Sequence, residues 1–334
     1  MKWKVPANPI KGHRKLTRHN QETRQRQQRT QNVVSSLSVA PTVTIPFKFG
    51  LGWTQGGLYE EASTLKHVHD IELLGSINDG DVDLRTTIFI DNQGVNVAFP
   101  DVYNQGQLGS CTANALAFCY QFDMLKQVIT FGLNKSSIPS RLFIYYYERA
   151  SENTINFDAG ANLSDGVTKV LAIKGVCSET DWPYYDTTNG NETYKKQPSP
   201  EAIANASFHK ALRETLMSNE YDRFKPLKPI AKSIANLKNN LKLGFPIAFG
   251  FTVYQSFYNI SESNPTMPIP SPSQGDKSLG GHAVVLVGFK DNEQVFIVRN
   301  SWGNDWGDNG YFYMPYEIID KYTTSDFWSI IEVS

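Results

Sequence analysis

The sequence is poor in cysteine, with Cys111, Cys119 and Cys177 as the only three in 334 residues. Such a low, odd number does not build a disulfide framework and favours a reducing compartment. No apolar run approaches the ~20 residues that a membrane-spanning helix needs. The basic N-terminus is also not followed by the hydrophobic core of a secretory signal. We therefore expect no membrane partner and favour an intracellular protein, while the compartment itself stays unknown.

The sequence also lacks an overall charge of either sign. Its formal net charge is −1, which by itself predicts neither a nucleic acid nor a membrane surface as a partner. Residues 1–31, however, hold nine Lys or Arg and one acidic residue, a local charge of +8 that leaves −9 for the rest. Such an arm can contact nucleic acid, another anionic surface or the acidic body itself. The simpler interpretation is a solvated, disordered tail.

Composition divides the chain into three parts. Residues 1–40 are rich in Gln, Arg and Ser with few apolar side chains, and we interpret them as a basic disordered arm. Residues 41–86 are mixed and precede every motif described below, which makes them a candidate pro-segment. The remainder, 87–334, predicts a folded domain with a helical part at about 105–230 and a β-rich part at about 231–334.

Helical periodicity begins at Cys111, because Ala115, Phe118, Phe122 and Leu125 fall on one face of a helix.

Further helices are predicted over SRLFIYYYERA, with Ser140 as the N-cap, and over SDGVTKVLAIKG, which Gly175 ends. The polar region 187–229 predicts loops and a surface helix, and KSIANLKNNLKLG predicts a helix that ends at Gly244.

Beyond Gly244 the pattern becomes that of strands. Five β-rich runs, separated by Gly, Asn and Asp turns, read PIAFGFTVY, HAVVLVGF, QVFIVRN, YFYM and FWSIIEV. A helical half followed by a β half predicts the α+β class.

Cys111 occupies a position that favours the thiolate form of its side chain. The thiolate is the nucleophilic form of cysteine, and the positive end of a helix and a nearby imidazolium both favour it. Cys111 opens a predicted helix after the turn NQGQLGS, and His282 follows a Gly-Gly turn at the start of an apolar strand. Asn300 ends the next strand and can accept from the ring N–H. The Gln105 amide, six residues before Cys111, can stabilise an oxyanion together with the Cys111 backbone N–H.

Three segments in order, QGQLGSC, GGHAVVLVGF and RNSWGNDWGDNGYFYM, resemble the papain-like cysteine peptidases over about residues 85–334. The resemblance implies a papain-like two-lobed fold, with a helical N-terminal lobe and an antiparallel β-barrel-like C-terminal lobe. GVCSETDWPY also resembles a segment that follows the third helix in family members.

The resemblance further implies a role for each motif residue. Cys111 is expected to be the nucleophile, His282 the base and acid, Asn300 the residue that orients the ring, and Gln105 the oxyanion donor. Trp302 is expected to border the substrate site and to shield the hydrogen bond between Asn300 and His282.

The chain departs from the family pattern near the nucleophile. The usual signature has a cysteine three residues before the nucleophile and an aromatic residue directly after it. Leu108 and Thr112 stand at these positions, and the disulfide partner is also missing near Ala159. The loss of both halves of a disulfide fits a reducing site of action. In the same stretch we expect the substrate strip, reduced here to Gly160, Ala161 and Asn162.

Other residues have simpler interpretations. Gly281, directly before His282, predicts an uncharged wall in the S2 pocket. Cys119 and Cys177 are interpreted as buried structural thiols. His67 and His69 stand two residues apart without a third ligand, and we interpret them as polar surface or pro-segment residues. No metal and no other cofactor is expected.

The sequence therefore predicts a cysteine endopeptidase that hydrolyses protein or peptide substrates through an acyl-enzyme and is made as a zymogen. The alternative is a catalytically inactive papain-fold protein that binds partners through the basic arm. A transglutaminase-like acyl transferase shares the Cys/His pair, but the NSWG motif and Gln105 favour hydrolysis.

Overall fold

The computed structural model describes residues 51–52, 80–87, 89–90, 96–127, 138–216, 234–322 and 324–334. All of them belong to one compact unit, residues 46–334. The basic arm, most of the candidate pro-segment, His67 and His69 lie outside the described residues, so the predictions made for them stay predictions.

The described residues contain every helix that the sequence predicts. The α-helices are α2 (Cys111–Lys126), α3 (Arg141–Ser151), α4 (Leu163–Asp165), α5 (Pro200–Ala206), α6 (Ile234–Lys242) and α7 (Tyr316–Lys321), and the π-helix η3 (Gly166–Lys174) continues α4. The short 3-10 helices are η2 (Leu84–Thr86), η4 (Thr188–Gly190), η5 (Thr193–Lys195), η6 (Gln255–Asn259) and η7 (Pro272–Gln274). The sequence did not predict α7, a six-residue helix too short to show a clear period.

The predicted helix ends are confirmed by their hydrogen bonds. Ser140 Oγ accepts from the Phe143 N–H at 3.1 Å and so caps α3, a contact that contributes about 1 kcal/mol. Gly175 ends η3 with φ at +81°, a conformation that glycine adopts without steric cost. Ser110 is the N-cap residue of α2, so Cys111 is the first residue of that helix.

The strands form one open antiparallel sheet. Its members are β1 (Val82–Asp83), β4 (Ala211–Leu216), β5 (Ile247–Tyr254), β6 (Ser278–Lys290), β7 (Val295–Arg299), β8 (Tyr311–Pro315) and β9 (Thr324–Val333). The order is β4-β9-β5-β6-β7-β8, with β1 beside β6, and a separate pair joins β2 (Phe89–Ile90) to β3 (Asn96–Val97). The expected α+β class is confirmed, and the sheet is not closed into a barrel.

One strand comes from a region where only loops and a helix were expected. β4 lies within the polar stretch 187–229 and pairs with β9 at the end of the sheet, with shifts in register along the pair. Its sequence, ALRETL, is too polar to show the alternation of a half-buried strand.

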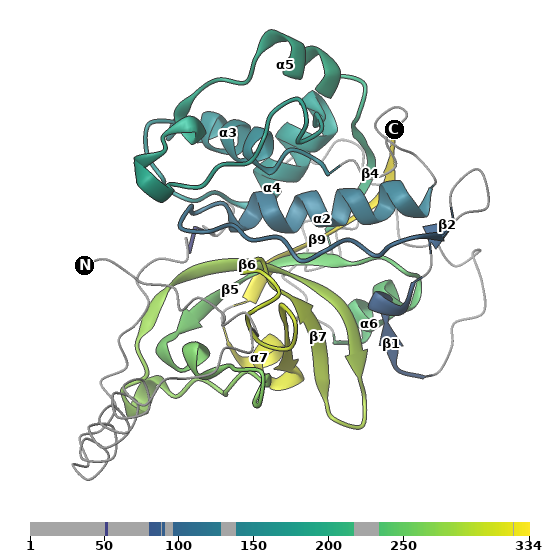
Figure 1. The fold of residues 1–334 in the computed structure, drawn as a ribbon. Coiled ribbons are helices and arrows are strands. Elements are labelled where there is room, and N and C mark those ends of the chain that lie inside the picture. The colour runs from purple at the N-terminus through teal and green to yellow at the C-terminus, as the bar shows by residue number, and fades with distance from the viewer. Residues whose placement is uncertain are drawn as a thin grey trace, which may run out of the picture. The chain divides into compact units, whose positions relative to one another are not determined.

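Helix α2 occupies the centre of the unit. Figure 1 shows it between α3 and α4 on one side and strands β5 and β6 on the other, and α2 contacts all of these elements. Every residue from Cys111 to Leu125 is buried, so the apolar face predicted from the sequence describes only part of the packing. A helix enclosed on all sides must hydrogen-bond its polar side chains internally, as Gln121 does by accepting from the Tyr103 hydroxyl at 2.5 Å.

Candidate active site

Cys111 lies at the N-terminus of α2 and is fully buried. The backbone N–H groups of Gly52, Thr112 and Ala283 lie close enough to the thiol to lower its pKa. Ala283 follows His282 in β6, so the sulfur lies against the strand segment that carries the imidazole. The helical part and the sheet thus meet at the predicted nucleophile and base.

His282 and Asn300 are joined by a buried hydrogen bond. The distance between His282 Nε2 and Asn300 Oδ1 is 2.8 Å, and the same oxygen accepts from the Ser301 N–H at 2.8 Å. Because Oδ1 is an acceptor in both contacts, we assign the ring proton to Nε2. Nδ1 is then the basic nitrogen, and it has no hydrogen-bond partner among the residues that the structure describes.

Aromatic rings cover this hydrogen bond. Trp302 stacks on His282 with ring centroids 4.9 Å apart and planes at 30°, and only 4% of Trp302 is exposed. Phe257 and Trp306 pack in turn against Trp302, at 5.6 and 5.1 Å. Excluding water lowers the local dielectric, which strengthens the bond between the ring and Asn300.

Gln105 is tied to the residue that follows Asn300. Its Oε1 accepts from Ser301 Oγ at 2.5 Å, and its backbone N–H donates to the Ser301 carbonyl at 2.9 Å. Its Nε2 donates to the Leu108 carbonyl at 2.9 Å, within the turn that leads to Cys111. Gln105 therefore connects the turn before the nucleophile to the segment after β7.

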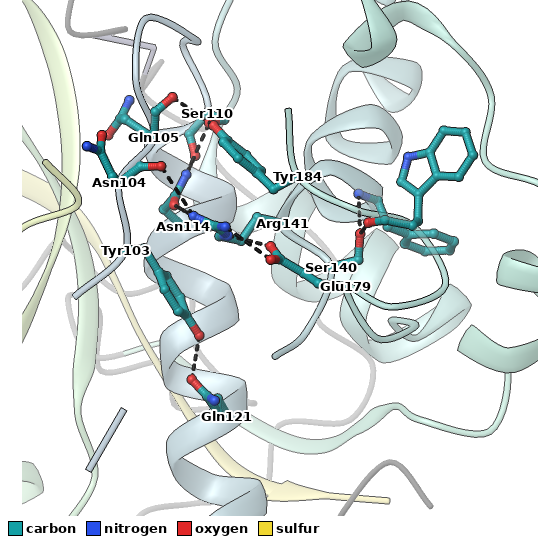
Figure 2. Close-up of polar contacts among 12 residues, drawn as sticks. Tyr103, Asn104, Gln105, Ser110, Asn114, Gln121, Ser140, Arg141, Glu179 and Tyr184 are labelled. Atoms are coloured by element: carbon teal, nitrogen blue, oxygen red, sulfur yellow. Dashed lines mark hydrogen bonds and ion pairs between the residues drawn. The ribbon is translucent and has the colours of Figure 1, made fainter. Parts of the chain in front are cut away.

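A tyrosine that the sequence analysis did not single out holds the same turn. Figure 2 shows Tyr184 beside Gln105 and Ser110. Its hydroxyl donates to the Gln105 carbonyl at 2.9 Å and accepts from Ser110 Oγ at 2.5 Å. Asn114 Nδ2 donates to the Ser110 carbonyl at 2.9 Å. Both ends of the turn are thus fixed from the helical side.

Arg141 extends this network from Asn114 to Glu179, as Figure 2 also shows. It donates to Asn114 Oδ1 at 3.2 Å and to the Asn104 carbonyl at 3.4 Å, and it forms a two-bond ion pair with Glu179 at 2.5 and 3.1 Å. Its guanidinium stacks over the Tyr184 ring, 4.0 Å from the centroid. The charged pair is mostly buried, and Arg141 Nε, Nη1 and Nη2 all donate hydrogen bonds, which favours a single conformation of this region.

The expected substrate strip divides into two parts. Gly160 is buried with φ at +74° and donates to the Tyr145 hydroxyl at 3.2 Å, while the Ala161 N–H donates to the Gly52 carbonyl at 2.5 Å. The Asn162 side chain instead caps α4 by accepting from the Asp165 N–H at 2.7 Å.

Gly281, the expected pocket wall, is half-buried in β6 opposite Thr252 of β5.

A carboxylate occupies the region of the missing disulfide. Asp158 Oδ1 accepts from the Gly109 N–H at 2.8 Å and from the Tyr145 hydroxyl at 2.6 Å. All three cysteines are free, and Leu108 is fully buried at the position of the lost cysteine. Hydrogen bonds therefore hold together the two segments that a disulfide joins in the papain-like pattern that the sequence resembles. The sequence carried no signal for Asp158, since its partners are 13 and 49 residues away.

Two residues of the candidate pro-segment lie beside Cys111 and the strand that carries His282. Gly52 is buried between Gly109 and Gly160, and Leu51 packs against Gly280. Both residues precede the folded domain that the sequence predicts, and no feature of the sequence singled them out.

Burial keeps the thiol and the imidazole neutral in this arrangement. It raises the pKa of Cys111 to about 11 and lowers the pKa of His282 to about 4, although the bond to Asn300 opposes the second shift. Between these values the sulfur keeps its proton and the ring stays uncharged. The covered site therefore holds Cys111 as a protonated thiol at neutral pH.

The other two cysteines are buried, as predicted. Cys119 and Cys177 are buried and free, and burial raises the pKa of the Cys177 thiol to about 12. Among the described residues, no group of three or more His, Cys, Asp or Glu side chains could hold a metal ion. The same residues include no helix with the length and apolar character to cross a membrane.

Comparisons with known proteins agree with this geometry. The family described as "Papain family cysteine protease" matches residues 151–327, a range that includes His282 and Asn300. A peptidase C1-like protein of Acanthamoeba polyphaga mimivirus, itself uncharacterized, is 40% identical over 259 residues, 77% of this chain and 76% of that protein. The crystal structure of xylellain, a cysteine protease from Xylella fastidiosa, has a TM-score of 0.68 at 35% identity and covers 85% of this chain and 97% of its own. Procathepsin B S9 from Trypanosoma congolense shares the fold, with a TM-score of 0.55 at 14% identity over 83% of this chain and 84% of that one.

Proposed function

Because the chain belongs to the papain family of cysteine proteases and is thus a peptide hydrolase, we propose that Cys111 is its nucleophile and His282 its general base and acid. The observation that carries the proposal is the buried hydrogen bond between His282 Nε2 and Asn300, under Trp302. This hydrogen bond leaves Nδ1 as the basic nitrogen of the ring. His282 belongs to the strand segment that lies against the Cys111 sulfur.

The reaction begins when the Cys111 proton moves to His282 Nδ1 and gives a thiolate and an imidazolium. The positive end of α2 and the imidazolium both favour this thiolate once the site is open. The sulfur attacks the peptide carbonyl carbon, and the electron pair of the C=O bond moves to oxygen. Gln105 Nε2 and the Cys111 backbone N–H stabilise that oxyanion.

Collapse of the tetrahedral species breaks the C–N bond, and His282 gives its proton to the leaving amine. The product is an acyl-enzyme, a thioester on Cys111. His282 then takes a proton from water as the water oxygen attacks the thioester carbonyl. When the C–S bond breaks, His282 returns that proton to the Cys111 sulfur, and the products are a carboxylic acid and the free thiol. Asn300 accepts from the ring N–H throughout and stabilises the imidazolium form.

The chain is further proposed to be made as a zymogen. Leu51 and Gly52 lie over the nucleophile, and burial holds Cys111 and His282 in their neutral forms. A protein or peptide substrate must displace this segment before it reaches the sulfur. Several proteins that share the fold were solved as proforms, procathepsin B S9 among them.

Two measurements on purified protein test the proposal. Incubation at mildly acidic pH, followed by sequencing of the new N-terminus, is expected to show cleavage before the folded domain and a rise in peptide hydrolysis. Cys111→Ala is expected to lower that hydrolysis by about 10⁴-fold or more and to abolish labelling by an epoxide thiol reagent. Equal labelling of both proteins would remove Cys111 as the nucleophile, and full activity with an unchanged N-terminus would contradict the zymogen.

Nothing in the described residues favours the alternative of an inactive binding protein. Contact between the basic arm and nucleic acid stays a prediction, because residues 1–40 are outside the described part of the chain. If the arm makes this contact, the full chain is expected to bind nucleic acid in a salt-sensitive way, and removal of the arm is expected to abolish the binding.

A further inference from the structure

Three glycines meet beside the Cys111 sulfur. An ideal Cβ on Gly52 would lie 2.0 Å from the Gly109 carbonyl oxygen and 2.7 Å from Gly160 Cα. A Cβ on Gly160 would lie 1.7 Å from the Gly52 carbonyl oxygen. The atoms on both sides are backbone, so no change of rotamer relieves the overlap. The slot between Gly109 and Gly160 therefore holds a glycine and no larger residue.

The two walls of this slot are fastened to the same pair of side chains. Gly109 donates to Asp158 Oδ1 at 2.8 Å, and Gly160 donates to the Tyr145 hydroxyl at 3.2 Å. Tyr145 in turn donates to Asp158 Oδ1 at 2.6 Å and is itself fully buried. Because each wall is tied to this pair, the slot cannot widen without breaking hydrogen bonds.

The occupant is bound through its backbone, as a substrate peptide is. The Gly52 carbonyl accepts from the Ala161 N–H at 2.5 Å, and the Gly52 N–H lies at the Cys111 sulfur. Leu51 is half-buried, and its Cβ would lie 3.5 Å from a Cβ on Gly280, an ordinary contact. The neighbouring position thus has room for an aliphatic side chain, while the position over the sulfur has none.

We propose that this slot is a glycine-selective subsite, and that the preferred substrates are peptides with an aliphatic residue followed by glycine, as in Leu51–Gly52. This inference rests on the proposed function, because it names the substrates of the same nucleophile. The chain's own segment occupies the slot because it matches that preference.

The first experiment measures the rate at which an epoxide thiol reagent labels Cys111 in the full-length protein at pH 7. Gly52→Ala cannot enter the slot, so its labelling is expected to be about tenfold faster or more than that of the wild type. Gly80→Ala is the matched control, since Gly80 is exposed and its Cβ would meet nothing within 4 Å. It is expected to keep the wild-type rate. A wild-type rate for Gly52→Ala, with its melting temperature unchanged, would overturn the inference.

The second experiment compares two peptides that differ only in Leu-Gly against Leu-Ala, with full-length Gly52→Ala as the enzyme. We expect kcat/KM to be at least about tenfold higher for the Leu-Gly peptide. Equal values would overturn the subsite and leave the peptidase intact.

Failure of the proposed function gives a different result, in which neither peptide is cleaved. In that case the test is how strongly each peptide slows the labelling of Cys111 by the epoxide. Stronger protection by the Leu-Gly peptide supports the subsite, and equal protection by both peptides overturns it.

Discussion

The two sides of the site are held by different forces. On the sheet side, one hydrogen bond joins His282 to Asn300 beneath the stacked ring of Trp302. On the helical side, the turn before Cys111 and the substrate strip are held by hydrogen bonds and an ion pair from residues far apart in sequence, Asp158 among them. The imidazole thus depends on a dry environment, whereas the turn depends on fixed anchors, which polar groups supply where a disulfide is missing.

Removal of the imidazole gives the largest effect. His282→Ala deletes the base, the acid and the counter-charge of the thiolate together, so kcat is expected to fall by about 10⁴-fold or more. Steady-state hydrolysis of a peptide substrate measures the loss. The variant should still bind that peptide, because the slot between Gly109 and Gly160 is untouched. Retention of more than a tenth of the activity would exclude His282 as the base.

A smaller loss is expected on the helical side from Tyr184→Phe. The change deletes the hydroxyl that bonds Gln105 and Ser110 and leaves the ring over Arg141, so kcat should fall about 10- to 100-fold with little change in KM. Tyr185→Phe is the matched control, because 49% of Tyr185 is exposed. Equal kinetic constants for the two variants would mean that the hydroxyl network does not position the turn.

The next change separates selectivity from catalysis. Asp158→Ala frees the Gly109 and Tyr145 donors, and the preference for Leu-Gly over Leu-Ala peptides should then fall severalfold as the slot widens. Asp158→Asn retains an oxygen acceptor and should keep most of the preference. The ratio of kcat/KM for the two peptides measures the effect. An unchanged ratio in Asp158→Ala would show that the walls do not depend on this carboxylate.

The pH dependence of the covered state can be measured without turnover. Since burial raises the pKa of Cys111 to about 11, labelling of the intact chain should rise about tenfold per pH unit from pH 6 to 9. Gly52→Ala exposes the pair, so its thiolate should form at lower pH and its labelling should change less over this range. A rate independent of pH in the intact chain would contradict a neutral, covered thiol.

The sequence predicts the sheet side far better than the helical side. His282, Asn300 and Trp302 lie within 21 residues of one another, the first on β6 and the other two directly after its neighbour β7, so local motifs carry their arrangement. The contact between Gly109 and Asp158 spans 49 residues, and that between Gln105 and Tyr184 spans 79. Such pairings depend on how whole helices pack, which periodicity does not encode.

The same limit applies to individual elements. The start of α2 at Cys111 and the cap at Ser140 follow from local chemistry and are confirmed. Strand β4 owes its existence to pairing with β9, and Leu51 and Gly52 owe their place to a slot built from residues more than 50 positions later. Long-range contacts override weak local preferences at both places.

The central claim is that Cys111 becomes covalently bound to the substrate during turnover. Mixing the activated enzyme with a peptide ester, quenching in acid within milliseconds and measuring the intact mass tests it most directly. We expect a mass increase equal to the acyl group, located on Cys111 by fragmentation and absent from Cys111→Ala. Continued hydrolysis with no adduct on Cys111 at any time would contradict it.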